Sequence, residues 1–335
     1  DADPIVCGGM TATGSAELAA GVSEAGGLGM LTSLHCRTPG NLHAEIARCR
    51  SMTKKPFGVN LTIMGEKRGE PEYPDEFVQV ITANHIRIVE TCGASHPLMI
   101  KLHAQLKRGG VEVIIHKCVK VSQAKRAQEK LGVDMISLMG YDSGGLPGEG
   151  DMGIFVQAAL AQKVLKIPFL LSGGVGTGQQ LTAALALGAA GVQIGTAFNA
   201  TRECVKFGSS YKRAMVEAGA NGTVVVGKSF PGGASRVIRN RDAVEMMRIE
   251  SEGGGRAGLK AGTLTFADVA HVAKFERLRE GMAANDAEQG IWNCGQSVAL
   301  VDKVVTCQEF IDRLMREAHA GMADVRGRFV AHSKL

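Results

Sequence analysis

The sequence predicts an α/β protein whose main part is a closed (β/α)8 barrel, with a smaller inserted or appended domain over the barrel mouth. Short apolar runs alternate with amphipathic helical segments from the N-terminus to about residue 200, as in repeated strand–helix units around a parallel sheet. The runs number eight, and glycine-rich turns follow the seventh and the eighth. Eight units in about 200 residues fit a TIM-type barrel better than an open, doubly wound sheet.

Each expected strand is a short apolar run. In chain order the strands are Pro4-Gly8, Gly29-Leu31, Phe57-Leu61, Ile86-Glu90, Val111-Ile115, Met135-Leu138, Phe169-Ser172 and Val192-Gly195. The helical segments between them often end at a glycine, a common C-cap residue. They include Ser15-Glu24, Leu42-Arg50, His96-Leu106, Ser122-Lys130, Ile154-Lys163 and Gln179-Leu187.

The alternation stops after the eighth run, where we expect a second domain. A helix-like stretch at 201–217 leads into a short apolar run at 224–226, a turn-rich segment at 230–240 and a glycine-rich loop at 253–258. We therefore expect a barrel made of residues 1–205 plus about 295–335, and a smaller substrate or capping domain at 206–294. The periodic segment Gln308-Ala318 is expected to return as the last barrel helix.

The composition excludes several classes of protein. The chain is 45% hydrophobic and 21% charged, as in globular proteins, and no apolar run approaches the roughly 20 residues that span a bilayer. The net charge of +5 comes from scattered Lys and Arg residues, and aromatics make up 4% of the chain. We therefore expect neither a nucleic acid nor a membrane as partner. A mildly positive field favours a small anionic substrate.

The eight cysteines form no CxxC pair and show no Cys/His spacing typical of zinc, so no metal site is expected. We expect reduced thiols. The alternative is that Cys118, near a strand end, is a reactive thiol, but a free cysteine more often packs as a small hydrophobe.

The chain ends in Ser333-Lys334-Leu335, the form of a peroxisomal import address in eukaryotes. If the source is eukaryotic and Leu335 is the true end, we expect binding to the peroxisomal import receptor and location in a peroxisome or related organelle. Otherwise the expected location is cytoplasmic. The sequence leaves the oligomeric state open, a homo-oligomer included.

The two glycine-rich turns predict a phosphate site. The turn after strand seven contains Gly173 and Gly174 and runs into the helix at Gln179, whose N-terminal dipole would favour an anion. The turn after strand eight is Gln193-Ile194-Gly195-Thr196, with two more backbone donors and a hydroxyl. No G-x-G-x-x-G pattern is present, which favours a mononucleotide-type phosphate over a dinucleotide.

Other candidate residues follow further strands at the same rim. Met10 and Thr11 follow strand one, and Asn60 ends strand three, where its amide would hydrogen-bond a heterocycle. His116 and Lys117 end strand five. The long, glycine-rich and acidic loop at 140–151 follows strand six and is expected to position a ligand.

Several stretches, spread over nearly the whole chain, together form a recognisable pattern. They are Pro4-Met10, Gly26-Leu31, Pro56-Leu61, Gly140-Gly145, Ser172-Val175, Ala184-Phe198, Phe230-Asn240 and Gly295-Ser297. In these stretches the chain resembles the nitronate monooxygenase family, formerly called 2-nitropropane dioxygenases, which are FMN-dependent barrels.

The resemblance implies FMN as cofactor. The contacts that it implies are Met10, Asn60, Gly144, Gly174, Gln193, Ile194, Gly195 and Thr196, to which the pattern of the mouth adds Thr11, Lys117, Gly145 and Gly173. With a flavin in this mouth, Lys117 would stabilise the reduced, anionic form and attract an anionic substrate.

One position departs from the family pattern. The family's glycine pair is followed by a His that acts as base on neutral nitroalkanes, and here that position is Leu146. The family's preceding Gln and Glu are Met139 and Asp142. Because Leu cannot accept a proton, the candidate catalytic bases are Asp142 and His116. A nitronate arrives already deprotonated and does not require that His.

The leading functional expectation is an FMN-dependent monooxygenase that oxidises alkyl nitronates with O₂ to carbonyl compounds and nitrite. One alternative is an FMN-dependent reductase that uses NAD(P)H to reduce a quinone or an enoyl thioester. Another is a flavin-binding homologue that has lost catalysis with its His. A nucleotide dehydrogenase of the inosinate type is set aside, because residues 139–153 contain no nucleophilic Cys.

Overall fold

We describe the protein from a computed structural model of the 335-residue chain. It describes residues 3–63, 74–93, 97–146, 151–230 and 234–332, without the side chains of 329–332. The terminal Ser333-Lys334-Leu335 and residues 147–150 of the loop after strand six therefore lie outside the described residues.

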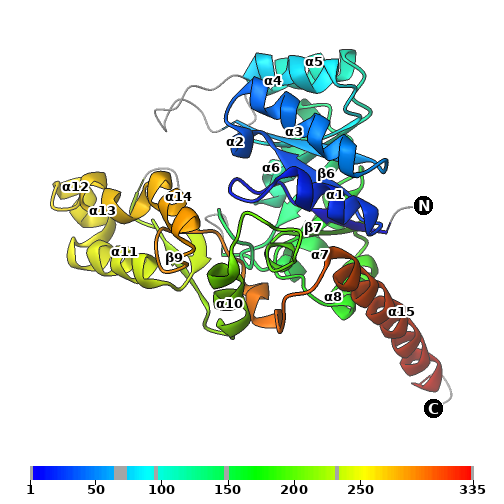
Figure 1. The fold of residues 1–335 in the computed structure, drawn as a ribbon. Coiled ribbons are helices and arrows are strands. Elements are labelled where there is room, and N and C mark those ends of the chain that lie inside the picture. Colours follow the sequence, from blue (N-terminus) through cyan, green and yellow to red (C-terminus); the bar gives the residue numbers. More distant parts are fainter. Residues whose placement is uncertain (1–2, 64–73, 94–96, 147–150, 231–233, 333–335) are drawn as a thin grey trace.

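The main part of the chain is a closed barrel of parallel strands, as predicted (Figure 1). Its eight strands are β1 (Ile5–Cys7), β2 (Gly29–Thr32), β3 (Phe57–Thr62), β4 (Ile88–Cys92), β5 (Val113–Cys118), β6 (Met135–Met139), β7 (Phe169–Ser172) and β8 (Gly191–Ile194). Neighbours pair in the order β1-β8-β7-β6-β5-β4-β3-β2. A parallel bridge between Val6 and Leu28 joins the two ends, and the Cys7 N–H donates to the Leu28 carbonyl at 2.9 Å.

Two strands lie further along the chain than predicted. The structure places β4 and β5 two to three residues beyond the expected Ile86-Glu90 and Val111-Ile115. Ile86 and Val111 are buried, but they belong to the segments that lead into the strands. An apolar run marks burial and does not by itself show where strand pairing begins.

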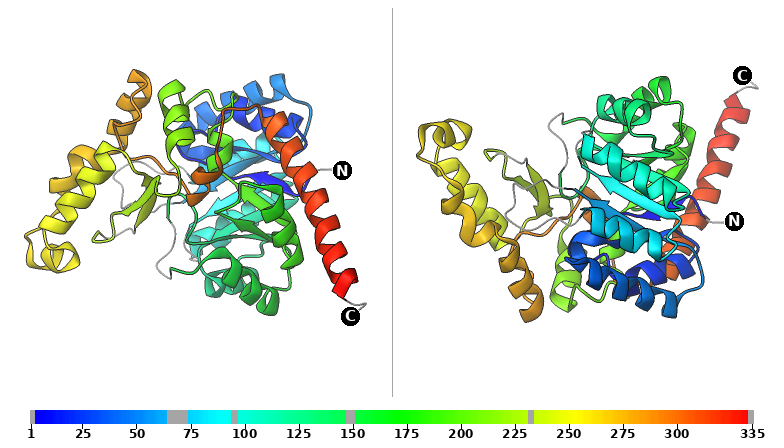
Figure 2. Two further views of the ribbon diagram at one scale, coloured as in Figure 1. Left: turned by 90° about the horizontal axis from the view of Figure 1, so that it is seen from below. Right: turned by 90° about the horizontal axis from the view of Figure 1, so that it is seen from above.

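Helices surround the barrel. They are α1 (Ala16–Glu24), α2 (Ser33–Cys36), α3 (Pro39–Met52), α4 (Pro74–Ala83), α5 (Pro97–Arg108), α6 (Val121–Lys130), α7 (Ile154–Val164), α8 (Gly178–Ala186), α9 (Thr196–Asn199), α10 (Ser209–Glu217) and α15 (Cys307–His332). The last of these, α15, returns from the far end of the chain to pack on α8 and α1, as expected for the segment at 308–318. Its second half extends beyond the barrel (Figures 1 and 2).

A smaller unit lies on the opposite side of the barrel from the projecting part of α15 (Figure 2). It consists of the antiparallel strands β9 (Thr223–Val226) and β10 (Ser235–Ile238) and the helices α11 (Arg241–Glu252), α12 (Gly255–Ala261), α13 (Phe266–Ala273) and α14 (Phe275–Ala284). A separate apolar cluster includes Val224, Val237, Met246 and Val269. The boundaries 206 and 294 stay a prediction.

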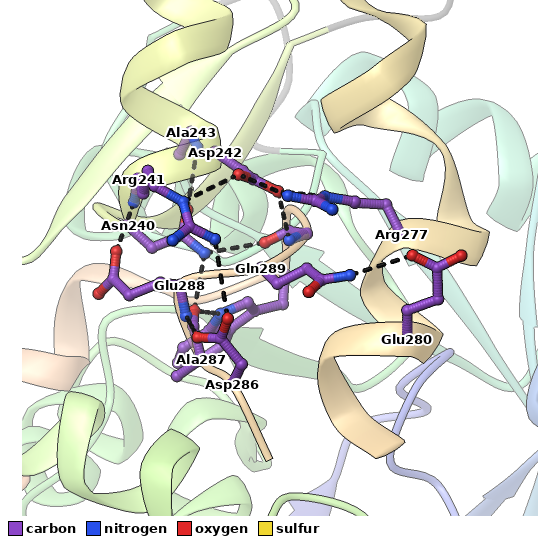
Figure 3. Close-up of polar contacts among 12 residues, drawn as sticks. Asn240, Arg241, Asp242, Ala243, Arg277, Glu280, Asp286, Ala287, Glu288 and Gln289 are labelled. Carbon is purple, nitrogen blue, oxygen red and sulfur yellow. Dashed lines mark hydrogen bonds and ion pairs between the residues drawn. The ribbon is translucent and has the colours of Figure 1, made fainter. Parts of the chain in front are cut away.

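The chain leaves the small unit through a tightly bonded segment at 286–290 (Figure 3). The buried Asp242 carboxylate accepts from Arg277 Nε at 2.9 Å and from the Gly290 N–H at 2.6 Å. The Asn240 amide donates to the carbonyls of Ala287 and Gly290, each at 2.8 Å. These contacts fix the start of the linker that runs back to the barrel.

Within the described residues, no helix combines the length and the apolar character needed to cross a membrane.

Two buried histidines lie on the outer face of the barrel and contact the same hydroxyl group. His116 on β5 contacts the Thr91 hydroxyl at 2.8 Å, and that hydroxyl contacts His103 of α5 at 3.1 Å. Burial, together with the nearby His103, lowers the pKa of His116 to about 4. Burial also lowers the pKa of His103. Both imidazoles are therefore neutral at neutral pH.

We expect His116 to make the folded state lose stability as the pH falls from about 6.5 to about 4, because the unfolded chain takes up its proton in that range and the folded chain does not. The loss from this group approaches about 3 kcal/mol. Urea unfolding at pH 7 and pH 4.5 should show a smaller pH effect for His116→Gln than for the natural protein. The exposed His271→Gln is the control, and an unchanged pH effect in His116→Gln would contradict the assignment.

Candidate functional site

The carboxyl ends of the strands form the mouth of the barrel, where enzymes of this fold carry their active sites. A layer of polar side chains, here called the mouth floor, lies just inside it and consists of Asn60, Glu90, Lys117, Ser137 and Gln193. Below this layer the barrel interior is apolar, with Val6, Met30, Ile115 and Leu170 packed together. The floor therefore separates the core from the mouth.

Glu90 of β4 is the centre of the mouth floor and was missed by the sequence reasoning. Its side chain has 0% exposure. Oε2 accepts from the Gly9 N–H at 3.0 Å and from Asn60 Nδ2 at 2.6 Å, and it lies 3.1 Å from Lys117 Nζ. Oε1 accepts from Gln193 Nε2. The sequence did hold a sign of this residue, because Glu90 is the acidic last residue of the otherwise largely apolar run 86–90.

Lys117 reaches the mouth as expected, but its charge is paired. Its side chain is 12% exposed, and Nζ also donates to the Gly9 carbonyl at 3.2 Å. The cation predicted to favour an anionic flavin therefore lies beside a buried carboxylate.

The side-chain amides of Asn60 and Gln193 each donate one hydrogen bond through nitrogen and accept one through oxygen at the mouth floor. The Asn60 carbonyl oxygen accepts from the Thr62 hydroxyl at 2.8 Å, and that of Gln193 accepts from the Ser137 hydroxyl at 2.5 Å. Asn60 is 1% exposed and lies under Gly9, where an added Cβ would come within 2.4 Å of it. Glu90 and Thr62 occupy one N–H and one lone pair of the Asn60 amide, so its contact with a heterocycle stays a prediction.

Loop 1 (residues 8–15) brings Met10 and Thr11 to the rim. The Met10 N–H donates to the Thr32 hydroxyl at 2.9 Å, and the Met10 sulfur lies beside Gly195. His35 of α2, which the sequence reasoning missed, hydrogen-bonds the backbone of loop 1. Burial and the nearby Lys206 charge lower the pKa of His35. The first and eighth loops therefore meet at one side of the mouth.

Loop 7 (residues 173–177) and Gly195 present unpaired amides. The N–H groups of Gly173, Gly174, Val175 and Gly195 donate no hydrogen bond to any residue that the structure describes. Because β7 and β8 are neighbours, with Ser172 opposite Gln193, the two turns lie side by side. Such a donor set fits a phosphate group, and Gln193 and Ile194 lead directly into it.

The start of α8 does not contribute as predicted. The Gly176 and Thr177 N–H groups donate to Gln180 Oε1, and the Gly178 N–H donates to Glu317 of α15 at 2.8 Å. A carboxylate at this helix terminus disfavours a second anion there. The N–H groups left to hold a phosphate are therefore those of Gly173, Gly174, Val175 and Gly195.

Loop 6 (residues 140–153, of which 147–150 are not described) connects loop 7 to the small unit. Its Ser143 hydroxyl donates to the Ser172 carbonyl at 3.2 Å, and Gly145 pairs through its backbone with Arg236 of β10 at 2.9 and 2.7 Å. Gly144 lies against Gly295, whose N–H donates to the Thr196 hydroxyl at 2.9 Å. The glycine pair thus lies where three segments converge.

The two candidate bases lie in different surroundings. His116 lies on the outer face of β5, against α5, because β5 continues to Cys118 and places Ile115 and Lys117 inside the barrel. The Asp142 carboxylate accepts from the Ile154 N–H at the start of α7, at 3.3 Å. It lines a pocket of about 350 Å³ between loop 7, α7, α8 and the 3-10 helix η2 (Gln296–Leu300). The expectation for His116 therefore needs correction, because its imidazole lies outside the barrel, while that for Asp142 stays a prediction.

Burial raises the pKa of every one of the eight cysteines above its ordinary value. All eight are free, and burial raises the pKa of Cys118 to about 12, which disfavours its thiolate. Among the described residues, no group of three or more His, Cys, Asp or Glu side chains is arranged to hold a metal ion.

Replacing Gly173 by alanine should weaken binding of FMN, the flavin that the sequence resemblance implies, at least about tenfold. Gly173 has φ +91°, and an added Cβ would lie 2.9 Å from the Ser143 backbone, so loop 7 must shift. Gly110→Ala is the matched control, because Gly110 has φ +92° with nothing within 4 Å. Fluorescence titration with FMN should separate the two variants. Equal affinities would show that loop 7 does not hold the phosphate.

The sequence is similar to known proteins over most of its length. The nitronate monooxygenase family model matches residues 2–317. The chain is 28% identical to the (3aS,4S,5R,7aS)-5-hydroxy-7a-methyl-1-oxo-octahydro-1H-indene-4-carboxyl-CoA dehydrogenase of Rhodococcus jostii, over 94% of this chain and 92% of that protein. It is 27% identical to a probable nitronate monooxygenase of Staphylococcus aureus, over 74% of this chain and 79% of that protein.

Solved structures are similar over almost the full length. FabK from Thermotoga maritima superposes with a TM-score of 0.82 at 30% identity, covering 97% of this chain and 95% of that one. A nitroalkane oxidase from Streptomyces ansochromogenes, at 23% identity, has the same fold with a TM-score of 0.75, covering 96% and 97% of the two chains. With the family model matching nearly every residue, the chain belongs to the nitronate monooxygenase family of oxidoreductases.

Proposed function

We propose that the protein is an FMN-dependent oxidoreductase that oxidises alkyl nitronates with O₂ to carbonyl compounds and nitrite. The observation that carries this proposal is the leucine in loop 6. There Leu146, 38% exposed, stands where the sequence resemblance places the family's base, His116 lies on the outer face of β5, and the Asp142 carboxylate accepts from the Ile154 N–H. A substrate that is already deprotonated suits this mouth better than a neutral nitroalkane does.

The residues of the mouth fit an FMN. The unpaired N–H groups of loop 7 and Gly195 would hold its phosphate, and loop 1 and the mouth floor would lie around the remainder. When bound, FMN supplies the electron transfer between substrate and O₂. The protein's own contribution is to orient the two reactants and to place a compensated charge pair at the floor of the mouth.

A second candidate is an FMN-dependent reductase of an enoyl thioester or a quinone that uses NAD(P)H. The relative that supports it is the Rhodococcus jostii enzyme, which is a dehydrogenase of a CoA thioester and matches 94% of this chain. Leu146 is compatible with this candidate too. A flavin-binding homologue without catalysis is the third.

Anaerobic mixing should separate these candidates. We expect a nitronate to bleach the flavin of the loaded protein and to support oxygen uptake when air is admitted, with the matching neutral nitroalkane at least about tenfold slower. NADH and NADPH, mixed separately, should leave the flavin spectrum unchanged. Bleaching by either nucleotide without a response to nitronates would favour the reductase. A protein that binds FMN and responds to neither has lost catalysis.

Restoring an imidazole at the rim should add activity on the neutral substrate. We expect Leu146→His to raise kcat/KM for a neutral nitroalkane at least about tenfold, because a general base contributes roughly 10²–10⁴-fold where it is well placed. Activity on the nitronate should change little. Leu160→His on α7, at a leucine of similar exposure (39% against 38%), is the control. If both variants gain equally, the effect is not that of a base in the mouth.

A further inference from the structure

We propose that Glu90 is a positioning residue that holds Lys117 at the mouth floor and cancels its charge, so that the bound flavin meets a neutral pair and not a free cation. This inference rests on the proposed flavin cofactor and deepens it. It concerns how strongly the protein favours negative charge on the flavin, a property that affects the reactions open to it.

The geometry makes Glu90 the fixed member of the pair. Its carboxylate is held by the Gly9 N–H and by the amides of Asn60 and Gln193, which come from three different segments around the barrel. Among the described residues, the Lys117 ammonium group has two polar contacts, Glu90 at 3.1 Å and the Gly9 carbonyl at 3.2 Å. The lysine therefore follows the position of the carboxylate.

Burial makes the cancellation effective. The Glu90 side chain has 0% exposure and that of Lys117 has 12%, so little water screens either charge. Two opposite charges 3.1 Å apart leave only a dipole for a group lying above them. Removing one member would leave a full charge of one sign close to the flavin.

If the two charges cancel, removing one or the other should have opposite effects on how strongly the protein favours negative charge on the flavin. Glu90→Gln leaves Lys117 unpaired and should favour negative charge on the flavin. Lys117→Met leaves Glu90 unpaired and should disfavour it. The double variant, Glu90→Gln with Lys117→Met, is neutral again and should return close to the natural protein.

Sulfite is a suitable probe, because its lone pair adds to oxidised flavin and places negative charge on the pyrimidine ring. Its dissociation constant can be read from the flavin absorbance without any turnover. We expect it to fall about tenfold in Glu90→Gln, to rise about tenfold in Lys117→Met and to lie within about threefold of the natural value in the double variant. Glu112→Gln, which removes a carboxylate from an exposed pair with Arg87, should leave it unchanged.

The outcomes distinguish a charge effect from a merely structural one. Shifts of the same sign in both single variants, or a double variant worse than either, would overturn the inference. If Glu90→Gln does not fold, the comparison of Lys117→Met with the double variant still decides, since only cancellation predicts recovery. Natural protein that refuses FMN overturns the proposed cofactor and this inference together. Natural protein that binds FMN but gives variants without these shifts overturns this inference alone.

Discussion

A carboxylate removed from solvent in the middle of the barrel is the constraint on which the mouth depends. An uncompensated ion in such a place costs several kcal/mol, even after the surroundings relax. Glu90 is compensated by donors from loop 1, β3, β5 and β8, which lie on different sides of the barrel. The hydrogen bonds and the ion pair that compensate this one carboxylate therefore fix the relative positions of several strand ends.

Loop 6 carries a second constraint, because three parts of the chain meet there. It bonds to the end of β7 through Ser143, pairs with β10 through Gly145 and touches the returning linker at Gly295. Arg236, only 4% exposed, lies over the Tyr141 ring and donates to the Tyr141 carbonyl at 3.1 Å. The small unit is thus attached to the loop that borders the mouth. A change in the position of either one is therefore expected to move the other.

These constraints shape the chemistry open to the mouth. Of the two groups that the sequence offered as bases, His116 lies on the outer face of the barrel and Asp142 accepts a hydrogen bond from the first residue of α7. The described residues at the mouth offer unpaired backbone amides and a lysine paired with a buried carboxylate, and loop 6 adds the exposed Leu146. Such a site orients its ligands and depends on the cofactor for reactivity.

The sequence by itself determined the barrel, its strand count, the returning helix and the two glycine turns, because these depend on local periodicity and on turn chemistry. Only the tertiary structure decided which face of a strand each side chain occupies. β5 continues to Cys118, so His116 lies within the strand, next to the inward-facing Ile115, and its side chain is on the outer face of the barrel. Glu90 gave no clear signal, because its four partners are distant in sequence and meet only when the barrel closes.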